Sequence, residues 1–156
     1  DRIIYMATFA TNKKAHFDYE ILETHEAGIE LLGNEVKSIR LGRAQLLGSF
    51  VIIRGGEAYI TGLTIPPYQA NNTQVTYIED RTRRLLLNKK QIKSIEESLK
   101  NKGLTLIAIS LYNKGPKIKI EIGLAKGKKK FDKRETIKKR DTDREVRRTL
   151  KTGKDS

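Results

Sequence analysis

Apolar and polar residues alternate through most of the first 125 positions, and this period-two pattern constrains the fold more than any other feature. Such alternation is typical of β-strands with one face packed and the other in water. It predicts strands at residues 19–23, 28–32, 49–54, 57–61, 104–112 and 117–124. Gly55-Gly56 joins two of these runs at the spacing of a tight hairpin, because glycine accepts the positive φ angles of primed turns.

One segment, residues 88–100, has helical spacing instead. It begins at Asn88, a favourable N-cap residue, places Ile92, Ile95 and Leu99 on one side, and is followed by Gly103. Six short strands around one helix predict a mainly β fold, an OB-like antiparallel β-barrel with one or two short helices, because closure removes exposed sheet edges. A flat sheet with helices on one side fits the same pattern and remains an alternative.

The positive charge of the chain is concentrated in its last 31 residues. The whole chain has 32 Lys and Arg against 19 Asp and Glu, a formal net charge of +13, and residues 126–156 carry +8 of it. This segment has too few apolar residues to dock as a helix on a core, so we expect it to be disordered alone and helical on a polyanion. The predicted organisation is a flexible N-terminus (1–11), a barrel (12–125) and a basic tail (126–156). Residues 1–5 precede the single methionine, Met6, and are treated as an appended or processed end.

Several function classes are disfavoured by composition. The chain has no cysteine, which removes disulfide frameworks and thiolate metal sites and points to the cytoplasm. No apolar run reaches the roughly 18 residues of a membrane-spanning helix. The only imidazoles, His16 and His25, accompany no nucleophile arrangement, and the Gly123 to Lys128 segment departs from the phosphate-loop spacing. We therefore predict no enzyme, no metal and no cofactor.

The residues are instead suited to holding phosphate. Arg81, Arg83 and Arg84 lead through Leu85 to Leu87 into the predicted helix start at Asn88, so cations, an apolar anchor and a helix N-terminus converge. Lys37, Arg40 and Arg43 form a second basic set near a predicted strand end. The alternative is that the arginines form a solvated loop and the leucines only pin the helix. Structured RNA fits better than duplex DNA, because no recognition helix or zinc finger is visible.

Six blocks of residues, in order and over most of the chain, closely resemble the bacterial SmpB family of SsrA-binding proteins. They are Asn12-Lys13-Lys14-Ala15, Glu26-Ala27-Gly28-Ile29-Glu30-Leu31, Gly33-Asn34-Glu35-Val36-Lys37-Ser38-Ile39-Arg40, Arg81-Thr82-Arg83-Arg84-Leu85-Leu86-Leu87-Asn88, Leu124-Ala125-Lys126-Gly127-Lys128-Lys129 and Asp132-Lys133-Arg134. The chain departs from the family's usual residues at Asn34 and Asn113, where aromatic residues are common, and at His16-Phe17, where an Arg-His pair is common.

The resemblance implies an RNA-binding barrel that holds the tRNA-like domain of transfer-messenger RNA (tmRNA) and delivers it, with elongation factor Tu, to stalled ribosomes. Alanyl-tRNA synthetase would be a partner only through the RNA. By position, Asn12, Glu26 and Leu86 match the family's RNA-contacting residues. The tail would enter the decoding centre and the empty message channel as a helix, through Lys126, Lys128, Lys129, Asp132, Lys133, Arg134, Lys138, Lys139 and Arg140.

Two other functions remain open from the residues alone. A basic barrel with a disordered tail also describes many ribosomal proteins, which sedimentation would reveal as stoichiometric on ribosomes. Scattered carboxylates leave room for an enzyme acting on RNA phosphodiesters, which incubation with RNA and Mg²⁺ would test.

Overall fold

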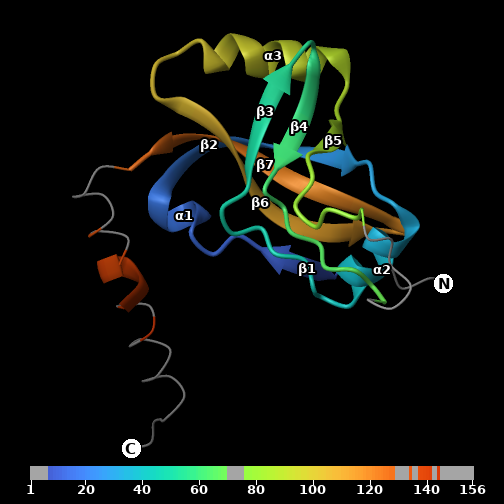
Figure 1. The fold of residues 1–156 in the computed structure, drawn as a ribbon. Helices are drawn as coiled ribbons and strands as arrows, with labels where there is room; N and C mark the ends of the chain where they lie inside the picture. The colour runs from blue at the N-terminus through green and yellow to red at the C-terminus, as the bar shows by residue number, and fades with distance from the viewer. Residues whose placement is uncertain (1–6, 70–75, 129–133, 135–136, 142–143, 145–156) are drawn as a thin grey trace, which may run out of the picture.

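Six antiparallel strands close into a ring in a computed structural model, which describes residues 7–69, 76–128, 134, 137–141 and 144 (Figure 1). Around the ring each strand pairs with the next, and the last pairs again with the first. The order is β6 (Leu104–Lys114), β3 (Phe50–Arg54), β4 (Glu57–Thr61), β5 (Arg83–Leu86), β2 (Tyr19–Ile29) and β7 (Lys117–Gly127). The predicted OB-like barrel is therefore confirmed, and the flat sheet is excluded.

Both predicted hairpins are present. Gly55 and Gly56 have φ angles of 58° and 74° between β3 and β4, as a primed turn requires. β6 and β7 pair from Leu104 opposite Lys126 to Lys114 opposite Lys117. The runs at 19–23 and 28–32 are not two strands: β2 is continuous from Tyr19 to Ile29, with an irregularity between Ile21 and Glu23 that lets one long strand follow the curvature of the barrel.

The core lies inside the ring and follows the predicted alternation. Ile120, Ile122 and Leu124 point inward from β7 and are at most 4% exposed. A second, smaller cluster lies on the outer face, where Ala15 of the short helix α1 (Ala15–Asp18) packs with Ile107, Ile109 and Ala125. One end of this outer face is thus covered by α1, and the rest is available for polar side chains.

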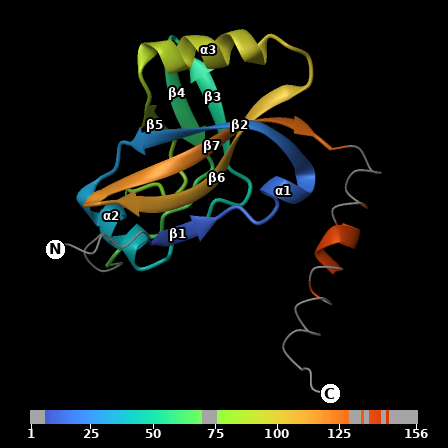
Figure 2. The same ribbon diagram turned by 180° about the vertical axis from the view of Figure 1, so that it is seen from behind.

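Four elements were not predicted: the short helix α1, described above, and the following three. β1 (Thr8–Thr11) pairs with the edge of β6, although residues 1–11 were assigned to a flexible N-terminus. β5 is a strand, although no strand was predicted there and the alternative interpretation placed its arginines in a solvated loop. α2 (Gly33–Arg40) is a helix, where the basic set beginning at Lys37 was placed near a strand end. α3 (Lys89–Leu99) was predicted and lies across one end of the barrel (Figure 2).

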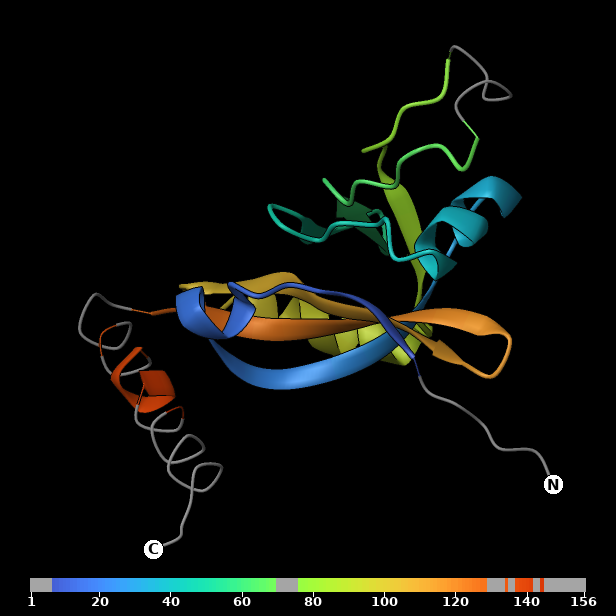
Figure 3. The same ribbon diagram turned by 90° about the horizontal axis from the view of Figure 1, so that it is seen from below.

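The tail leaves the barrel beside α1. β7 continues to Gly127, two residues beyond the predicted end of the barrel at residue 125, and the backbone N–H of Lys128 donates to the carbonyl of Asp18 at 2.8 Å. Residues 134, 137–141 and 144 are helical, on the same side of the molecule as α1 (Figure 3). The guanidinium of Arg140 lies 5.3 Å from the ring centre of Phe17. The described residues include no helix long and apolar enough to cross a membrane.

Candidate RNA interface

A row of directly opposed residues crosses four strands on the outer face of the barrel. Leu86 of β5 faces Gly28 of β2, Gly28 faces Lys119 of β7, and Lys119 faces Tyr112 of β6. Opposed residues of antiparallel strands share a face, so these side chains form one continuous surface. We call it the outer row. It combines an apolar group that is 45% exposed, a glycine, a cation and a phenol.

Glu26 stands next to the outer row, two residues before Gly28 on β2, and its carboxylate is held by two donors. The Tyr112 hydroxyl donates to Oε2 at 2.5 Å, and the Lys114 Nζ donates to Oε1 at 3.2 Å. The hydrogen bond from Tyr112, followed by that from Lys114, lowers the pKa of Glu26 below 4.5. Burial, followed by the hydrogen bond to Glu26, raises the pKa of Tyr112 above its usual 10. Near neutral pH the pair is therefore a carboxylate bound to a neutral phenol.

An open groove of about 390 Å³ adjoins the outer row. It runs between β2, the start of α2 and the β6–β7 hairpin, and is lined by Gly28, Ile29, Leu31, Val36, Leu86, Pro116, Lys117, Ile118 and Lys119. A Cβ atom at Gly28 would lie 3.2 Å from the Cβ of Leu86, so a side chain there would require a small shift of Leu86. The groove therefore offers an apolar floor with ammonium groups at its rim.

The three candidate arginines before the helix do not form one exposed set. Arg83 is fully buried, and its guanidinium donates to Glu35 at 2.6 Å and 2.9 Å and to the carbonyls of Leu63 and Glu79. The prediction that Arg83 contacts RNA is wrong for this structure, because the side chain is fully buried and its guanidinium donates to groups inside the protein. Arg81 is partly exposed and also binds Glu35, at 2.6 Å.

Arg84 and Asn88 are exposed, yet both have partners in the barrel. Arg84 donates to Glu57 at 3.0 Å and to Glu30 at 3.2 Å. The hydrogen bond to Glu57 is the largest cause of the raised pKa of the Arg84 guanidinium. Asn88 accepts from the backbone N–H of Gln91 at 2.8 Å and so caps α3, as its position predicted. The alternative, in which the arginines form a solvated loop, is therefore wrong for Arg83, which is buried in a strand.

The second basic set lies on and just after α2, beside aromatic rings. The Lys37 Nζ lies 5.4 Å from the ring centre of Tyr68, and the Arg40 guanidinium lies 5.9 Å from that of Phe9. Arg40 also donates to the carbonyl of Pro116 at 2.7 Å, which ties α2 to the β6–β7 hairpin beside the groove. Within this set, Arg40 therefore borders the groove.

Asn12 lies on the other flank of the outer face, between β1 and α1. Its Nδ2 donates to the carbonyl of Ala108 at 2.9 Å, and its backbone N–H donates to that of Ile109 at 2.8 Å. The structure thus brings Glu26 and Leu86 together around the outer row, with Arg40 beside the adjoining groove, and places Asn12 apart from them.

The tail candidates are placed only in part. Lys126 lies in β7 opposite Glu20 and Leu104, and the Lys128 Nζ donates to the carbonyl of His16 at 2.6 Å. Arg134, Lys138, Lys139 and Arg140 are helical and exposed. Lys129, Asp132 and Lys133 lie outside the described residues, as does the predicted helix cap at Asp132.

Sequence reasoning missed three outer-face residues, Tyr112, Lys114 and Lys119. Tyr112 and Lys119 stand at outward positions of predicted strands, and Lys114 lies in the segment predicted to be the turn between them. These positions indicate exposure but do not identify the neighbouring residues. Their approach to Glu26 depends on the register of β2, β7 and β6, which joins residues more than 80 positions apart.

A closed, basic β-barrel with a cation-rimmed outer face defines the class of oligonucleotide-binding barrel proteins. Comparison with known proteins narrows this class. The family model for SmpB protein matches residues 9–152. The chain therefore belongs to the SmpB family, which is a family of RNA-binding proteins and not of enzymes.

Individual relatives agree over nearly the full chain. The SsrA-binding protein of Chlorobaculum tepidum is 50% identical over 145 residues, covering 92% of each chain. That of Pseudomonas aeruginosa is 47% identical over 148 residues, covering 95% of this chain and 93% of the relative. A solved structure described as "tmRNA-SmpB: a journey to the center of the bacterial ribosome" has a TM-score of 0.64 at 42% identity, covering 77% of this chain and 84% of that chain.

Proposed function

We propose that this protein binds tmRNA in the cytoplasm and acts with it in trans-translation, with the outer row and Glu26 as the surface that holds the tRNA-like domain. The observation that carries the proposal is the Glu26 carboxylate, held by Tyr112 and Lys114 beside an exposed Leu86. Membership of the SmpB family supports it.

The parts of this surface have different tasks. Lys117 and Lys119 at the groove rim attract phosphates regardless of sequence, and this term weakens as salt rises. Leu86 offers an apolar contact for an unstacked base. A carboxylate repels phosphate unless it accepts from base N–H groups or a 2′-hydroxyl, so Glu26 adds selectivity for a particular RNA shape more than affinity.

Exchanging Glu26 for alanine tests this division. Glu26→Ala should weaken binding to the tRNA-like domain far more than binding to an unrelated RNA of equal length, as measured by filter binding at fixed salt. Glu97→Ala is the matched control, because Glu97 is also an exposed acid paired with a lysine, Lys100, and lies on α3. Equal losses for both RNAs would show that Glu26 supports the barrel rather than selects the ligand.

We further propose that the tail occupies the decoding centre and the empty message channel, while elongation factor Tu and alanyl-tRNA synthetase act through the RNA. The 14 basic residues among positions 126–156 support this, since a channel lined by RNA phosphates attracts such a segment.

Removing residues 129–156 tests the role of the tail. The cut spares β7 and the Lys128 contacts with α1, so the barrel stays complete. Binding to the tRNA-like domain should be nearly unchanged, whereas peptide tagging on stalled ribosomes in a reconstituted translation system should be lost. A truncated chain that still supports tagging would refute the proposed role.

A further inference from the structure

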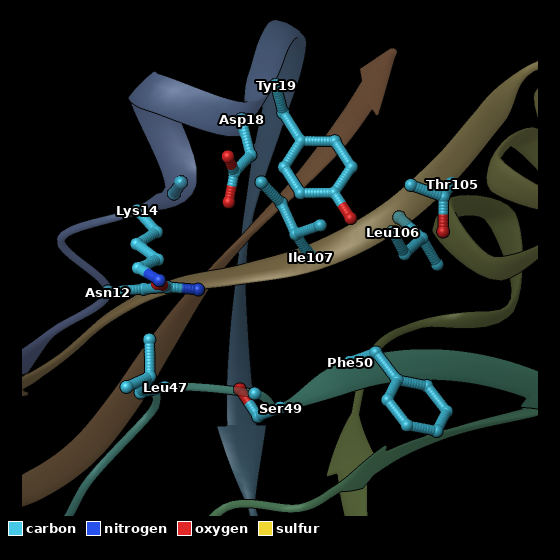
Figure 4. Close-up of a pocket in the computed structure, with 12 residues that line it drawn as sticks. Asn12, Lys14, Asp18, Tyr19, Leu47, Ser49, Phe50, Thr105, Leu106 and Ile107 are labelled. Atoms are coloured by element: carbon cyan, nitrogen blue, oxygen red, sulfur yellow. The ribbon is translucent and has the colours of Figure 1, made fainter. Parts of the chain in front are cut away.

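A cavity of about 420 Å³ opens on the flank of the barrel where β6 changes its neighbour. β1 pairs with β6 from Ser110 to Tyr112, whereas β3 pairs with it at Leu106, so the edge of β6 between them is left to side chains. Asn12 stands at one wall and Phe50, the first residue of β3, at the other (Figure 4). The volume is at the lower end of the range of small-ligand sites, roughly 300–1,000 Å³.

Polar groups with unused hydrogen-bonding capacity face this cavity. The Asn12 Nδ2 is committed to the carbonyl of Ala108, which leaves Oδ1 as an acceptor. The Ser49 hydroxyl donates to the carbonyl of Leu46 at 2.7 Å, so its oxygen can still accept. Figure 4 shows the Lys14 side chain directed toward the same space. Acceptors of this kind match the N–H donors of a nucleobase edge, and the Lys14 ammonium matches a phosphate.

Two large apolar side chains beside the cavity are exposed. Phe50, the first residue of β3, is 47% exposed, and Leu47, three residues before it, is 63% exposed. Flat apolar faces next to hydrogen-bonding groups are the usual setting for an unstacked base.

From these features we infer that the cavity between Asn12 and Phe50 is a binding site for one unstacked nucleotide of the bound RNA. The base packs against Phe50, its edge donates to Asn12, and its phosphate lies at Lys14. The site is separate from the outer row but opens beside the same outer face, so one folded RNA can reach both. This inference rests on the proposed RNA binding and extends it to residues 47–50.

Substituting Phe50 tests the site with the tRNA-like domain of tmRNA as the probe. Phe50→Ala should weaken binding by about 5- to 150-fold, the range expected when one stacked base loses its aromatic partner, while Phe50→Tyr should bind like the unmodified protein. Ile78→Ala is the control, since Ile78 is another large apolar residue that is 60% exposed. Leu47→Ser provides a second variant, which should also weaken binding and which leaves the strand intact.

Photochemical cross-linking separates the possible outcomes. A cross-link from the RNA to Phe50 or Tyr19 supports the nucleotide site. If the unmodified protein binds the RNA but Phe50→Ala and Leu47→Ser bind equally well, the site is refuted while the proposed function stands. A cross-link from the tail to this cavity that persists with RNA bound would assign the cavity to the protein's own chain and overturn the inference. Failure of the unmodified protein to bind would overturn both proposals.

Discussion

Removing the carboxylate of Glu35 should destabilise the fold more than any surface substitution, because this group neutralises a fully buried arginine. Its two oxygens accept from Arg81, Arg83, the Tyr77 hydroxyl and the backbone N–H of Leu32, which begins α2. The side chains of Glu35 and Arg83 are 1% and 0% exposed. Water therefore cannot replace the lost partner in Glu35→Ala.

The expected magnitude follows from this burial. Breaking a buried ion pair on one side costs about 3–5 kcal/mol, because the remaining charge stays uncompensated. For a chain of this size that corresponds to a fall in the melting temperature of roughly 6–20 °C. Replacing both partners, as in Glu35→Leu with Arg83→Met, should cost less than the sum of the two single changes, because no buried charge is left alone.

Urea denaturation followed by circular dichroism measures these costs as shifts in the midpoint at constant slope. Glu97→Ala, at an exposed pair on α3, serves as the reference and should change the free energy of unfolding by less than about 1 kcal/mol. A loss for Glu35→Ala no larger than this reference would refute the reasoning. So would equal losses for the double variant and for the sum of the singles.

The pH dependence gives a second measure of the same pair. Burial raises the pKa of Glu35, but the hydrogen bonds from Arg81, Leu32 and Arg83 together outweigh it, so the pKa lies below 4.5. A lowered folded-state pKa stabilises the protein above the unfolded value, and this stabilisation is lost as pH falls through the folded pKa. The unmodified protein should therefore lose stability below about pH 4.5 more steeply than Glu35→Ala.

Two further predictions concern single hydrogen bonds. Tyr112→Phe should raise the pKa of Glu26 back toward 4.5, as followed by carboxyl NMR titration, because the donor that contributes most to its lowering is removed; an unchanged pKa would mean that Tyr112 does not hold the carboxylate. Asn88→Ala should destabilise the protein by about 1 kcal/mol in the same urea assay, since it removes the cap of α3, and a neutral result would show that packing alone fixes this helix end.

The sequence was sufficient to predict those elements that are determined by residues close together in the chain. Alternation over about ten residues places the hairpin of β6 and β7, and the cap at Asn88 places the start of α3. α2 was missed because its eight residues have no favourable N-cap side chain, since Leu32 stands there. Its start is fixed by the Glu35 carboxylate accepting from the Leu32 backbone, and that carboxylate is held in turn by arginines 46 and 48 positions away.

For Arg83, the sequence could have predicted that the side chain points inward, but not which residue it would contact. In β5 the side chains alternate, so that Arg83 and Leu85 point inward while Arg84 and Leu86 point outward. A cluster of arginines suggests a phosphate surface, but four residues of alternation already separate two of them onto opposite faces. The sequence could not show that Glu35, an acid on α2, would lie close enough to form an ion pair with the inward-pointing Arg83. An inward-pointing arginine in a strand is stable only with such a partner, so its presence in a sequence predicts a buried acid.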